Sequence, residues 1–396
     1  MLTIVHSNLA RLDGGILRID RKFHTGMQEY LRHLDVPLLS IHPELPRGQE
    51  SSVMDLVEIP EAELGYQVMT LHCPTPNKPT PEALARLRSA VEKSSLVYGT
   101  SFGSRTMCTQ TGVPYVAILE YNLRTDVSFA TANVDGIVRR AWRGLRAARF
   151  HLTEVIPSMR GAAMLHCNGY PSYNEGGWFN SRRLLYLDSR MYTSMLIDEE
   201  RFKERLAARR KRPPRLLFSG RLEPTKGALD VVKIAAEPAL RDVPCEFIIY
   251  GQGSQRAAME QYVAANGLSA RVKIHEPIPY PELVEVASDC DVFICCHVQD
   301  DPSCTYLESM GCGLPIVGYA NAMWKAMQAA SQAGIVTPLG STAQAASALR
   351  SLLQNQNELD HLSTKARAFA SSHTFEREFA RRTDSIKELL AARASS

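Results

Sequence analysis

Two carboxylates, Asp300 and Glu308, mark the part of this sequence whose residue types best suit chemistry. Asp300 follows the apolar run DVFICC, which predicts a buried strand, and residues 303–310 are predicted to form a short helix. The amides of Ser303, Cys304 and Thr305 would then lie at a helix N-terminus, where anions bind. Glu308 lies too far along to cap this helix, and a buried carboxylate needs hydrogen-bond donors, which a ribose diol would supply. The stretch therefore predicts an anion site next to a ribose site, with Asp300 facing the same crevice.

A second candidate set follows the predicted strand at 215–218 and consists of Gly220, Arg221 and Lys226. Arg221 comes directly after the turn at Gly220, and Lys226 stands just before the next predicted helix. Both cations can point at the crevice beyond the strand, where a guanidinium and an ammonium together suit a diphosphate. A solvated loop with two ordinary surface cations fits the spacing equally well. The loop is neither a G-x-x-x-x-G-K-[ST] phosphate loop nor a G-x-G-x-x-G fingerprint.

Alternating strands and helices must position these residues. In the first half, apolar runs at 2–7, 36–41, 67–72, 95–99 and 113–119 predict strands, with helical spacing between them. A second alternation begins at 215, after a basic stretch at 201–215 that is predicted as a domain boundary. The fold class is therefore predicted to be α/β, with doubly wound domains at 1–200 and 213–375. Ligands are expected in a cleft between them, beyond the C-terminal ends of the strands.

The bulk composition excludes several classes of protein. The 396 residues carry a formal charge of only +3, which does not favour a nucleic-acid partner. The nine cysteines form no C-x-x-C pair, which predicts reduced thiols and a cytoplasmic location. No secretory signal and no membrane-spanning run of about 18 apolar residues are predicted. The Cys, His and Asp residues at 295–304 match no standard zinc spacing, so no metal site is predicted.

Four elements occur in a specific order over about residues 215–320: FSGRLEPTKG, FIIYGQG, the acids Asp300 and Glu308, and ESMGCGLPIVG. In these elements the chain resembles the donor half of a GT-B glycosyltransferase of the large retaining group called family four. The resemblance implies two Rossmann-like domains facing a cleft, an acceptor domain first and a nucleotide-sugar donor domain second. It also implies that a final helix within 376–396 returns to the first domain.

The resemblance also implies a role for each matching residue. Arg221 and Lys226 would hold the donor diphosphate and offset the charge that develops on the leaving group. Glu308 would bind the ribose, and Asp300 would contact the donor sugar. The other donor-binding positions implied are Gly14 and Gly15 in a Gly-rich loop after the first strand, Gly220, Ile278, whose main chain would read the base, and Ser303, Cys304 and Thr305.

Three departures from the family pattern concern the reacting sugar. Asp300 stands where the family usually has the longer Glu, and Asp301, Pro302 and Ser303 replace its usual GFG. Glu120 ends the run VPYVAILE, where the family commonly has a His that faces the reacting sugar. We expect Glu120 to stabilise an oxocarbenium-like centre or to contact the acceptor hydroxyl. The alternative is a structural Glu held by hydrogen bonds.

A basic helix is predicted at 135–150, with Trp142, Leu145 and Phe150 among its arginines. Helices of this kind bind anionic membranes peripherally. Together with 201–215 it would form one long basic region. The alternative is a helix with an apolar stripe in the core and a solvated Arg face.

The resemblance implies a retaining hexosyltransferase that needs no metal and no cofactor. The donor would be a nucleotide-sugar, with UDP favoured over GDP, and the acceptor a saccharide or a polyprenyl-linked saccharide in surface polysaccharide or exopolysaccharide synthesis. The alternatives are a nucleotide-sugar epimerase or another GT-B enzyme, and a non-catalytic nucleotide-sugar-binding module.

Overall fold

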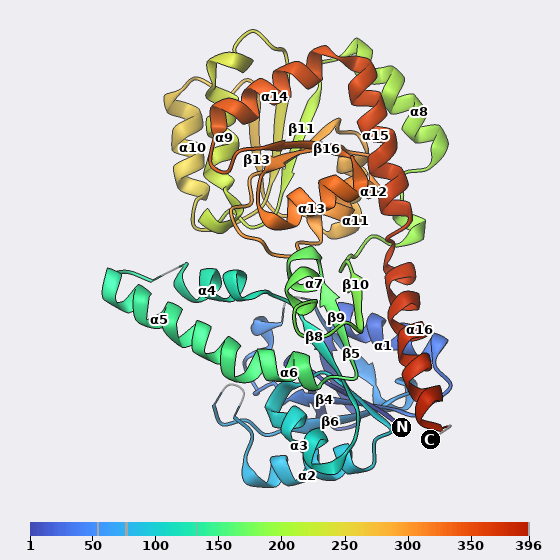
Figure 1. The fold of residues 1–396 in the computed structure, drawn as a ribbon. Coiled ribbons are helices and arrows are strands. Elements are labelled where there is room, and N and C mark those ends of the chain that lie inside the picture. The colour runs from blue at the N-terminus through green and yellow to red at the C-terminus, as the bar shows by residue number, and fades with distance from the viewer. Residues whose placement is uncertain (54, 76–77, 133, 395–396) are drawn as a thin grey trace. The chain divides into compact units, whose positions relative to one another are not determined.

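The computed structural model of the chain describes residues 1–53, 55–75, 78–132 and 134–394. The chain divides into two compact units (Figure 1). Unit 1 comprises Met1–Leu123, Leu145–Tyr186 and Glu376–Ser396, and unit 2 comprises Arg124–Gly144 and Leu187–Phe375.

Unit 1 is built on a parallel sheet with the strand order β10-β9-β8-β7-β1-β4-β6. These strands span Arg183–Tyr186, Met164–Asn168, Tyr115–Leu119, Leu96–Tyr98, Leu2–Val5, Leu38–Pro43 and Gln67–Leu71. The helices α1 (Arg21–His33), α2 (Pro81–Glu92), α3 (Ser104–Thr111), α6 (Ile156–Gly161) and α7 (Tyr170–Gly176) connect them. The five predicted strands are confirmed, because strands buried on both faces of a parallel sheet read as apolar runs.

A small antiparallel sheet in unit 1 was not predicted. It contains β2 (Arg11–Asp13), β3 (Ile16–Asp20) and β5 (Leu56–Pro60). Gly14 and Gly15 form the two-residue turn between β2 and β3, with φ of 60° and 73°. Such hairpin turns require positive φ at both central residues, which glycine adopts at low cost. The two glycines therefore follow the first strand, as predicted, but they form the turn of a hairpin that was not predicted, and their contact with a donor stays a prediction.

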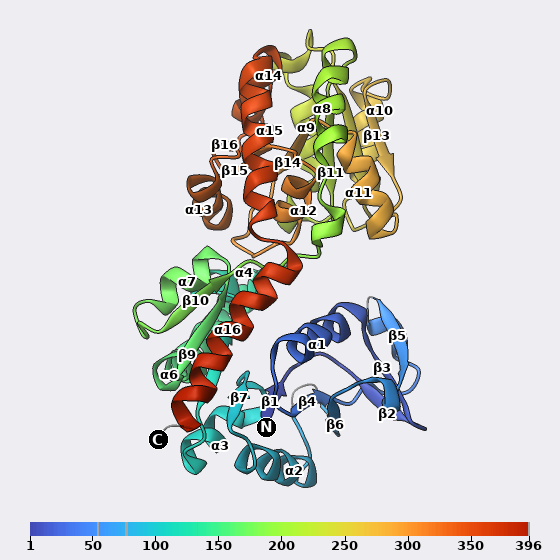
Figure 2. The same cartoon turned by 90° about the vertical axis from the view of Figure 1, so that its right-hand side faces the viewer.

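The C-terminal helix α16 (Phe375–Ala394) packs within unit 1 against α1 and β9 (Figure 2). A Cβ on Gly26 of α1 would lie 2.8 Å from the Phe379 ring, so this glycine allows close packing of the two helices. The hydroxyl of Ser385 lies 2.8 Å from Nε2 of His166 on β9. Burial, together with the nearby Arg382, lowers the pKa of His166 to about 3.

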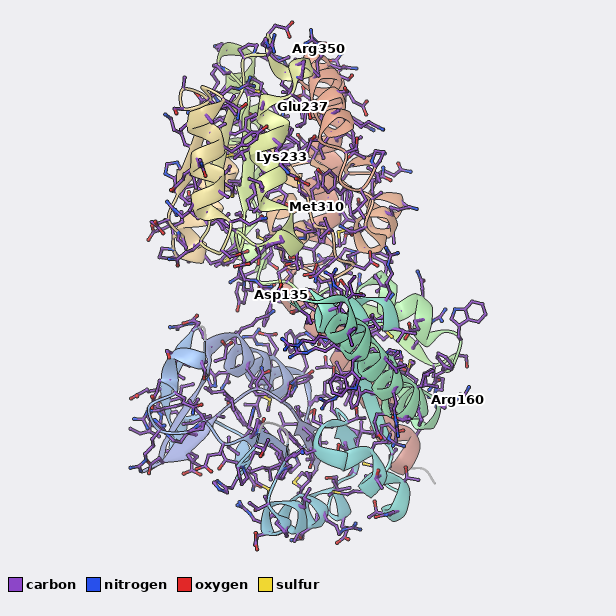
Figure 3. All side chains as sticks on the ribbon, turned by 90° about the vertical axis from the view of Figure 1, so that its left-hand side faces the viewer. Asp135, Arg160, Lys233, Glu237, Met310 and Arg350 are labelled. Atoms are coloured by element: carbon purple, nitrogen blue, oxygen red, sulfur yellow. The ribbon has the colours of Figure 1, made fainter. Side chains whose placement is uncertain are left out.

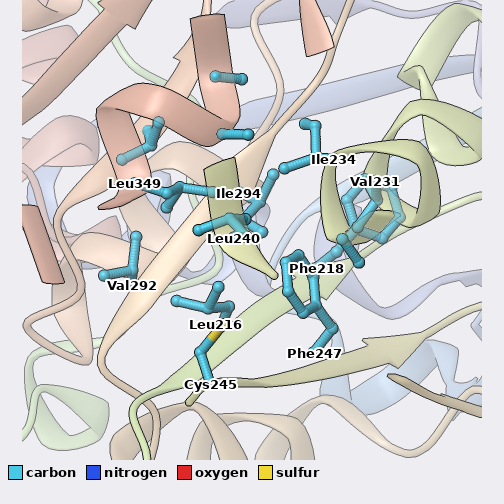
Figure 4. Close-up of a cluster of buried hydrophobic side chains, with 14 of the residues drawn as sticks. Leu216, Phe218, Val231, Ile234, Leu240, Cys245, Phe247, Val292, Ile294 and Leu349 are labelled. Atoms are coloured by element: carbon cyan, nitrogen blue, oxygen red, sulfur yellow. The ribbon is translucent and has the colours of Figure 1, made fainter. Parts of the chain in front are cut away.

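Unit 2 is built on a second parallel sheet, in the order β13-β12-β11-β14-β15-β16. These strands span Val272–His275, Glu246–Tyr250, Arg215–Ser219, Val292–Cys295, Ile316–Tyr319 and Gly334–Thr337. Its sheet helices are α9 (Ala228–Ala236), α10 (Arg256–Ala265), α11 (Tyr280–Ser288), α12 (Thr305–Gly311), α13 (Ala322–Ser331), α14 (Thr342–Gln354) and α15 (Gln356–Ser371). The core in Figure 4 joins strands to helices through Leu216, Phe218, Phe247, Ile294, Val231, Ile234 and Leu349.

The basic stretch at 201–215 lies within unit 2 and is not the boundary between the two units. Most of it forms α8 (Glu199–Ala208), which belongs to unit 2, and the chain passes from unit 1 to unit 2 at Tyr186–Leu187. Arg205 is buried and donates hydrogen bonds to the carbonyls of Cys312 at 2.5 Å and Gly313 at 2.8 Å. Arg209, also buried, pairs with Asp360. Arg205 and Arg209 thus stabilise the packing of this segment within unit 2. Because both are buried, they do not contribute to a basic surface.

Helix α5 (Ile137–Phe150) follows α4 (Leu123–Thr131) and continues through a π-helical turn at His151–Val155 into α6. Asp135 and Arg160, labelled in Figure 3, lie at the two ends of this run. No residue of α5 is buried, so the predicted alternative of a core stripe on this helix is wrong. Among the helices of the described residues, none is long and apolar enough to cross a bilayer.

Candidate active site

Lys226 and Asp301 form a buried ion pair at the carboxyl ends of the adjacent strands β11 and β14. The Lys226 ammonium donates to Oδ2 of Asp301 at 2.6 Å, and the two residues are 7% and 8% exposed. The other oxygen, Oδ1, is buried and finds no hydrogen-bond partner within the described residues. Lys226 was predicted to face this crevice, but its pairing with Asp301 was not.

A glycine turn holds Lys226 against the end of β14. Lys226 ends a 3-10 turn, Pro224–Lys226, and Gly227 follows with φ of 62°. A Cβ on Gly227 would lie 2.1 Å from the carbonyl oxygen of Cys296. Only glycine lets the backbone approach this closely in a left-handed conformation, so this turn fixes the position of the lysine.

Arg221 is exposed and makes no ion pair with a described residue. Burial lowers the pKa of His297 well below its usual value, and the charges of Lys226 and Arg221 add to this effect. Both cations therefore act on one buried imidazole, and their convergence on a donor diphosphate stays a prediction. The Nδ1 atom of His297 is buried without a partner among the described residues.

Asp300 contacts the start of α13. Its Oδ1 accepts a hydrogen bond from the amide of Ala322 at 2.6 Å, and its Oδ2 lies 3.4 Å from Nε of Arg124. A carboxylate at a helix N-terminus is stabilised by the helix dipole. Asp300 therefore has a structural contact that the sequence did not reveal, and its contact with a donor sugar stays a prediction.

Glu308 is buried on α12 beside a cation that the sequence did not identify. Nε of Arg190 donates to Oε1 of Glu308 at 2.9 Å, and the guanidinium lies 4.5 Å from the centre of the Tyr280 ring. Burial lowers the pKa of Arg190, but the Glu308 carboxylate outweighs this and raises it above its usual value. The Glu308 carboxylate is thus held in one orientation, and Tyr280 and Glu308 line the same small cavity.

The loop at Asp301, Pro302 and Ser303, which stands where the family has GFG, forms hydrogen bonds within its own segment. The amide of Ser303 donates to the carbonyl of Asp301 at 2.9 Å, and the hydroxyls of Ser303 and Thr305 lie 2.6 Å apart. Cys304 has its Sγ 3.8 Å from Oδ2 of Asp188. Helix α12 begins at Thr305, close to its predicted start. Of the three amides predicted to face an anion, that of Ser303 is therefore engaged within the loop.

The remaining predicted donor residues in unit 2 lie in turns at the carboxyl ends of the parallel strands. Gly220 follows β11, and its amide donates to the carbonyl of Tyr250 at 3.1 Å. Ile278 lies in the loop between β13 and α11. The structure thus brings together Gly220, Arg221, Lys226, Ile278, Asp300, Ser303, Cys304, Thr305 and Glu308 in unit 2, while Gly14, Gly15 and Glu120 lie in unit 1.

Glu120 follows β8 and is held by two side chains of unit 1. Oε2 accepts a hydrogen bond from Nδ2 of Asn168 at 2.7 Å, and Oε1 accepts one from the Tyr186 hydroxyl at 3.3 Å. The carboxylate is exposed. It is thus both oriented by neighbours, as a structural residue would be, and accessible, as a reacting residue must be.

Comparison with known proteins agrees with this architecture. Residues 198–369 match the family model "Glycosyl transferases group 1". Over 120 residues, 30% of this chain and 31% of the relative, the sequence is 32% identical to 2-deoxystreptamine glucosyltransferase of Streptomyces kanamyceticus. The chain spans less than half the length of the curated relatives it matches.

Two solved structures show the same fold over 99% of both chains at 14% identity. They are the Anabaena protein HepE in complex with UDP, with a TM-score of 0.67, and sucrose-phosphate synthase from Thermosynechococcus elongatus, with a TM-score of 0.68. The fold is therefore GT-B. The residues that match the group 1 glycosyltransferase model all lie in unit 2.

Proposed function

We propose that the protein is a retaining glycosyltransferase that moves a hexosyl unit from a nucleotide-sugar to a saccharide or a lipid-linked saccharide. The proposal is supported by the burial of Lys226 and Glu308 in the unit that matches the group 1 model, with Arg221 exposed two residues after the end of β11. HepE, which shares the fold, has been solved with UDP and with UDP-glucose. UDP is therefore the first candidate nucleotide and GDP the second.

The chemistry assigned to this crevice is charge compensation on the leaving group. The acceptor oxygen would bond to the anomeric carbon on the face from which the nucleotide diphosphate departs. The bond between that carbon and the diphosphate oxygen would break, and the acceptor proton would pass to the departing oxygen. Arg221 and Lys226 would stabilise the negative charge on the diphosphate, so the proposal needs no metal. Glu308 would hold the ribose through hydrogen bonds from its hydroxyls.

Incubation with labelled UDP- and GDP-sugars, with and without candidate saccharide acceptors, tests this proposal. We expect slow hydrolysis of one donor without acceptor, and loss of about 10²-fold or more in rate for Arg221→Ala and for Lys226→Ala. Wild-type rates in both variants would refute the assignment. Tight donor binding without turnover would favour a binding module, and conversion of the donor to its epimer would favour an epimerase.

Peripheral contact with an anionic membrane is the second part of the proposal, and helix α5 supports it. Val138, Trp142 and Leu145 are each at least 60% exposed and recur at helical spacing. The same helix carries five arginines, at positions 139, 140, 143, 146 and 149. Exposed apolar side chains beside a basic face are typical of helices that lie in a membrane interface. A membrane-bound enzyme would meet lipid-linked saccharides of surface polysaccharide assembly there.

Cosedimentation with vesicles that contain phosphatidylglycerol tests this contact. Trp142→Ser should reduce the bound fraction several-fold, because it removes the largest exposed apolar side chain from the helix. Trp178→Ser is the matched control, since Trp178 is 85% exposed but lies outside α5. Equal binding of the two variants, or no binding of the wild type at low salt, would contradict the proposal.

A further inference from the structure

The first half of α5 is an exposed arm of unit 2. Residues 137–144 of α5 belong to this unit, as do residues 124–131 of α4, the helix that precedes it. Every residue from Asp135 to Arg143 is exposed, so this part of α5 buries no face of its own. A segment with few buried apolar contacts has low local stability. The position of the arm can therefore change when a partner binds it.

Helix α4 connects this arm to the rest of unit 2. A Cβ on Gly144 of α5 would lie 3.5 Å from Cγ2 of Thr131 and 3.6 Å from Cγ1 of Val127, so the two helices pack directly against each other here. Nε of Arg140 also donates a hydrogen bond to the carbonyl of Thr131 at 3.3 Å. Because α4 and α5 are in contact, a shift of α5 moves α4 with it.

Arg124, in the first turn of α4, connects the arm to the predicted donor crevice. Its Nε lies 3.4 Å from Oδ2 of Asp300. The side chain of Asp300 is 5% exposed, whereas that of Arg124 is 73% exposed. Asp300 is the acid predicted to contact the donor sugar, and its other oxygen accepts a hydrogen bond from the amide of Ala322. The position of Arg124 therefore decides how far the charge of Asp300 is neutralised.

The ion pair between Arg124 and Asp300 is weak enough to respond to the arm. An ion pair with one exposed partner contributes little, because water screens it and because a long side chain must be held in one geometry. A partner that binds one arrangement of the arm better than another shifts the population toward the first. An anionic membrane does this when it holds the exposed arginines and Trp142 of α5, since these groups meet a flat surface in one orientation of the helix.

We propose that a membrane bound at α5 regulates the donor crevice through α4. When an anionic surface fixes the arm, Arg124 stays on Asp300 and neutralises it, so a negatively charged nucleotide-sugar meets one carboxylate fewer. Away from the membrane the pair opens more often, and Asp300 then repels the donor. This regulation rests on the proposed donor site and the proposed membrane contact. It makes the enzyme more active at the surface where a lipid-linked acceptor would lie.

Equilibrium dialysis of labelled UDP against the protein, with vesicles that contain phosphatidylglycerol or with neutral vesicles, tests this regulation. We expect the anionic vesicles to tighten UDP binding about two- to fivefold, which is the range that one such ion pair can contribute. Trp142→Ser, which should bind the vesicles less, should show a smaller effect. Equal UDP affinity in both conditions, although the wild type binds the anionic vesicles, would overturn the inference.

Variants of Arg124 locate the effect. Arg124→Gln should still cosediment with anionic vesicles but lose their effect on UDP affinity, and Arg124→Lys should restore most of that effect. Arg241→Gln is the matched control and should respond like the wild type, because it removes an exposed arginine of unit 2 that precedes β12, at the amino ends of the strands. A vesicle effect that survives in Arg124→Gln would overturn the path through α4.

The same measurements separate this inference from the proposals on which it rests. If neither UDP nor GDP binds, with or without vesicles, the donor site itself is refuted and the regulation with it. If the wild type does not bind anionic vesicles, the membrane contact is refuted and the regulation with it. If both bind and UDP affinity does not respond to the vesicles, only the regulation is refuted.

Discussion

Replacing Asp301 with Asn removes one negative charge next to the lysine that is proposed to hold the donor diphosphate. The two side chains are only 9% and 12% exposed, and Nζ of Lys226 lies 2.6 Å from Oδ2 of Asp301. In this arrangement the carboxylate already neutralises the ammonium. A diphosphate that contacts Lys226 must therefore bind beside Asp301 and is repelled by it.

The size of this repulsion follows from the geometry. A phosphate oxygen in contact with Lys226 would lie about 5 Å from the Asp301 carboxylate, where two unit charges repel by about 3 kcal/mol at an effective dielectric of about 20. Water in the crevice screens part of this energy. We therefore expect Asp301→Asn to tighten UDP binding by at least about tenfold, or about 1.4 kcal/mol, and to tighten UMP binding less, because UMP carries less charge.

Isothermal titration of UDP and UMP into the two proteins measures the effect. Asp242→Asn is the control, because it removes a carboxylate that is paired with Arg350. Asp242 precedes β12 and therefore lies at the amino ends of the strands, away from the crevice. Unchanged or weaker UDP binding in Asp301→Asn, at an unchanged melting temperature, would refute the reasoning. The carboxylate would then serve to orient Lys226 for the donor rather than to oppose it.

Three further predictions concern the turn beside the site, the nucleotide contact and the buried histidine. Gly227→Ala should lower the free energy of unfolding by about 3 kcal/mol or more in urea titrations, whereas Gly267→Ala, which has φ of 65° and no atom within 4 Å of its Cβ, should cost only about 1–2 kcal/mol. Arg190→Ala should weaken UDP binding but spare pyrophosphate binding, because it releases Glu308 and leaves the phosphate contacts; equal losses would contradict a ribose role. Because folding lowers the pKa of His166 to about 3, below pH 6.5 only the unfolded state takes up its proton, so stability is lost as the pH falls. His166→Gln should reduce the slope of unfolding free energy between pH 6.5 and 4 by up to about 1.4 kcal/mol per pH unit, and an unchanged slope would show that His166 does not titrate in this way.

The strands and helices could be predicted from the sequence wherever burial imposes a simple pattern. The parallel strands read as apolar runs because both faces of each sheet are covered. The hairpin around Gly14 and Gly15 could not be predicted because β2 (RLD) and β3 (ILRID) mix charged with apolar residues, whereas a strand as short as β7 (LVY) still reads as an apolar run. The stretch at 201–215 was predicted as a domain boundary because it is rich in basic residues, but Arg205 in α8 and Arg209 directly after it are buried with partners.

The positions of the candidate site residues could be predicted, but their partners could not. Lys226 and Asp301 are 75 residues apart in sequence, and Arg190 and Glu308 are 118 apart. No local pattern encodes contacts over such separations, because the crossover connections of the sheet bring them together. The adjacent acids at 300 and 301 were visible in the sequence, but only the structure shows that Asp300 contacts the α13 N-terminus while Asp301 faces Lys226.

The order in which the units are completed during synthesis follows from the place of α16. Unit 2 is nearly continuous from Leu187 to Phe375, but unit 1 takes its last helix from residues that the ribosome adds after all of unit 2. Until then, Tyr30 and His166 lack their contacts with Phe379 and Ser385. Domains generally fold as units while the chain emerges, N-terminal parts first. In this chain the N-terminal unit can be completed only after the residues of unit 2 have been synthesised, because its last helix follows them in sequence.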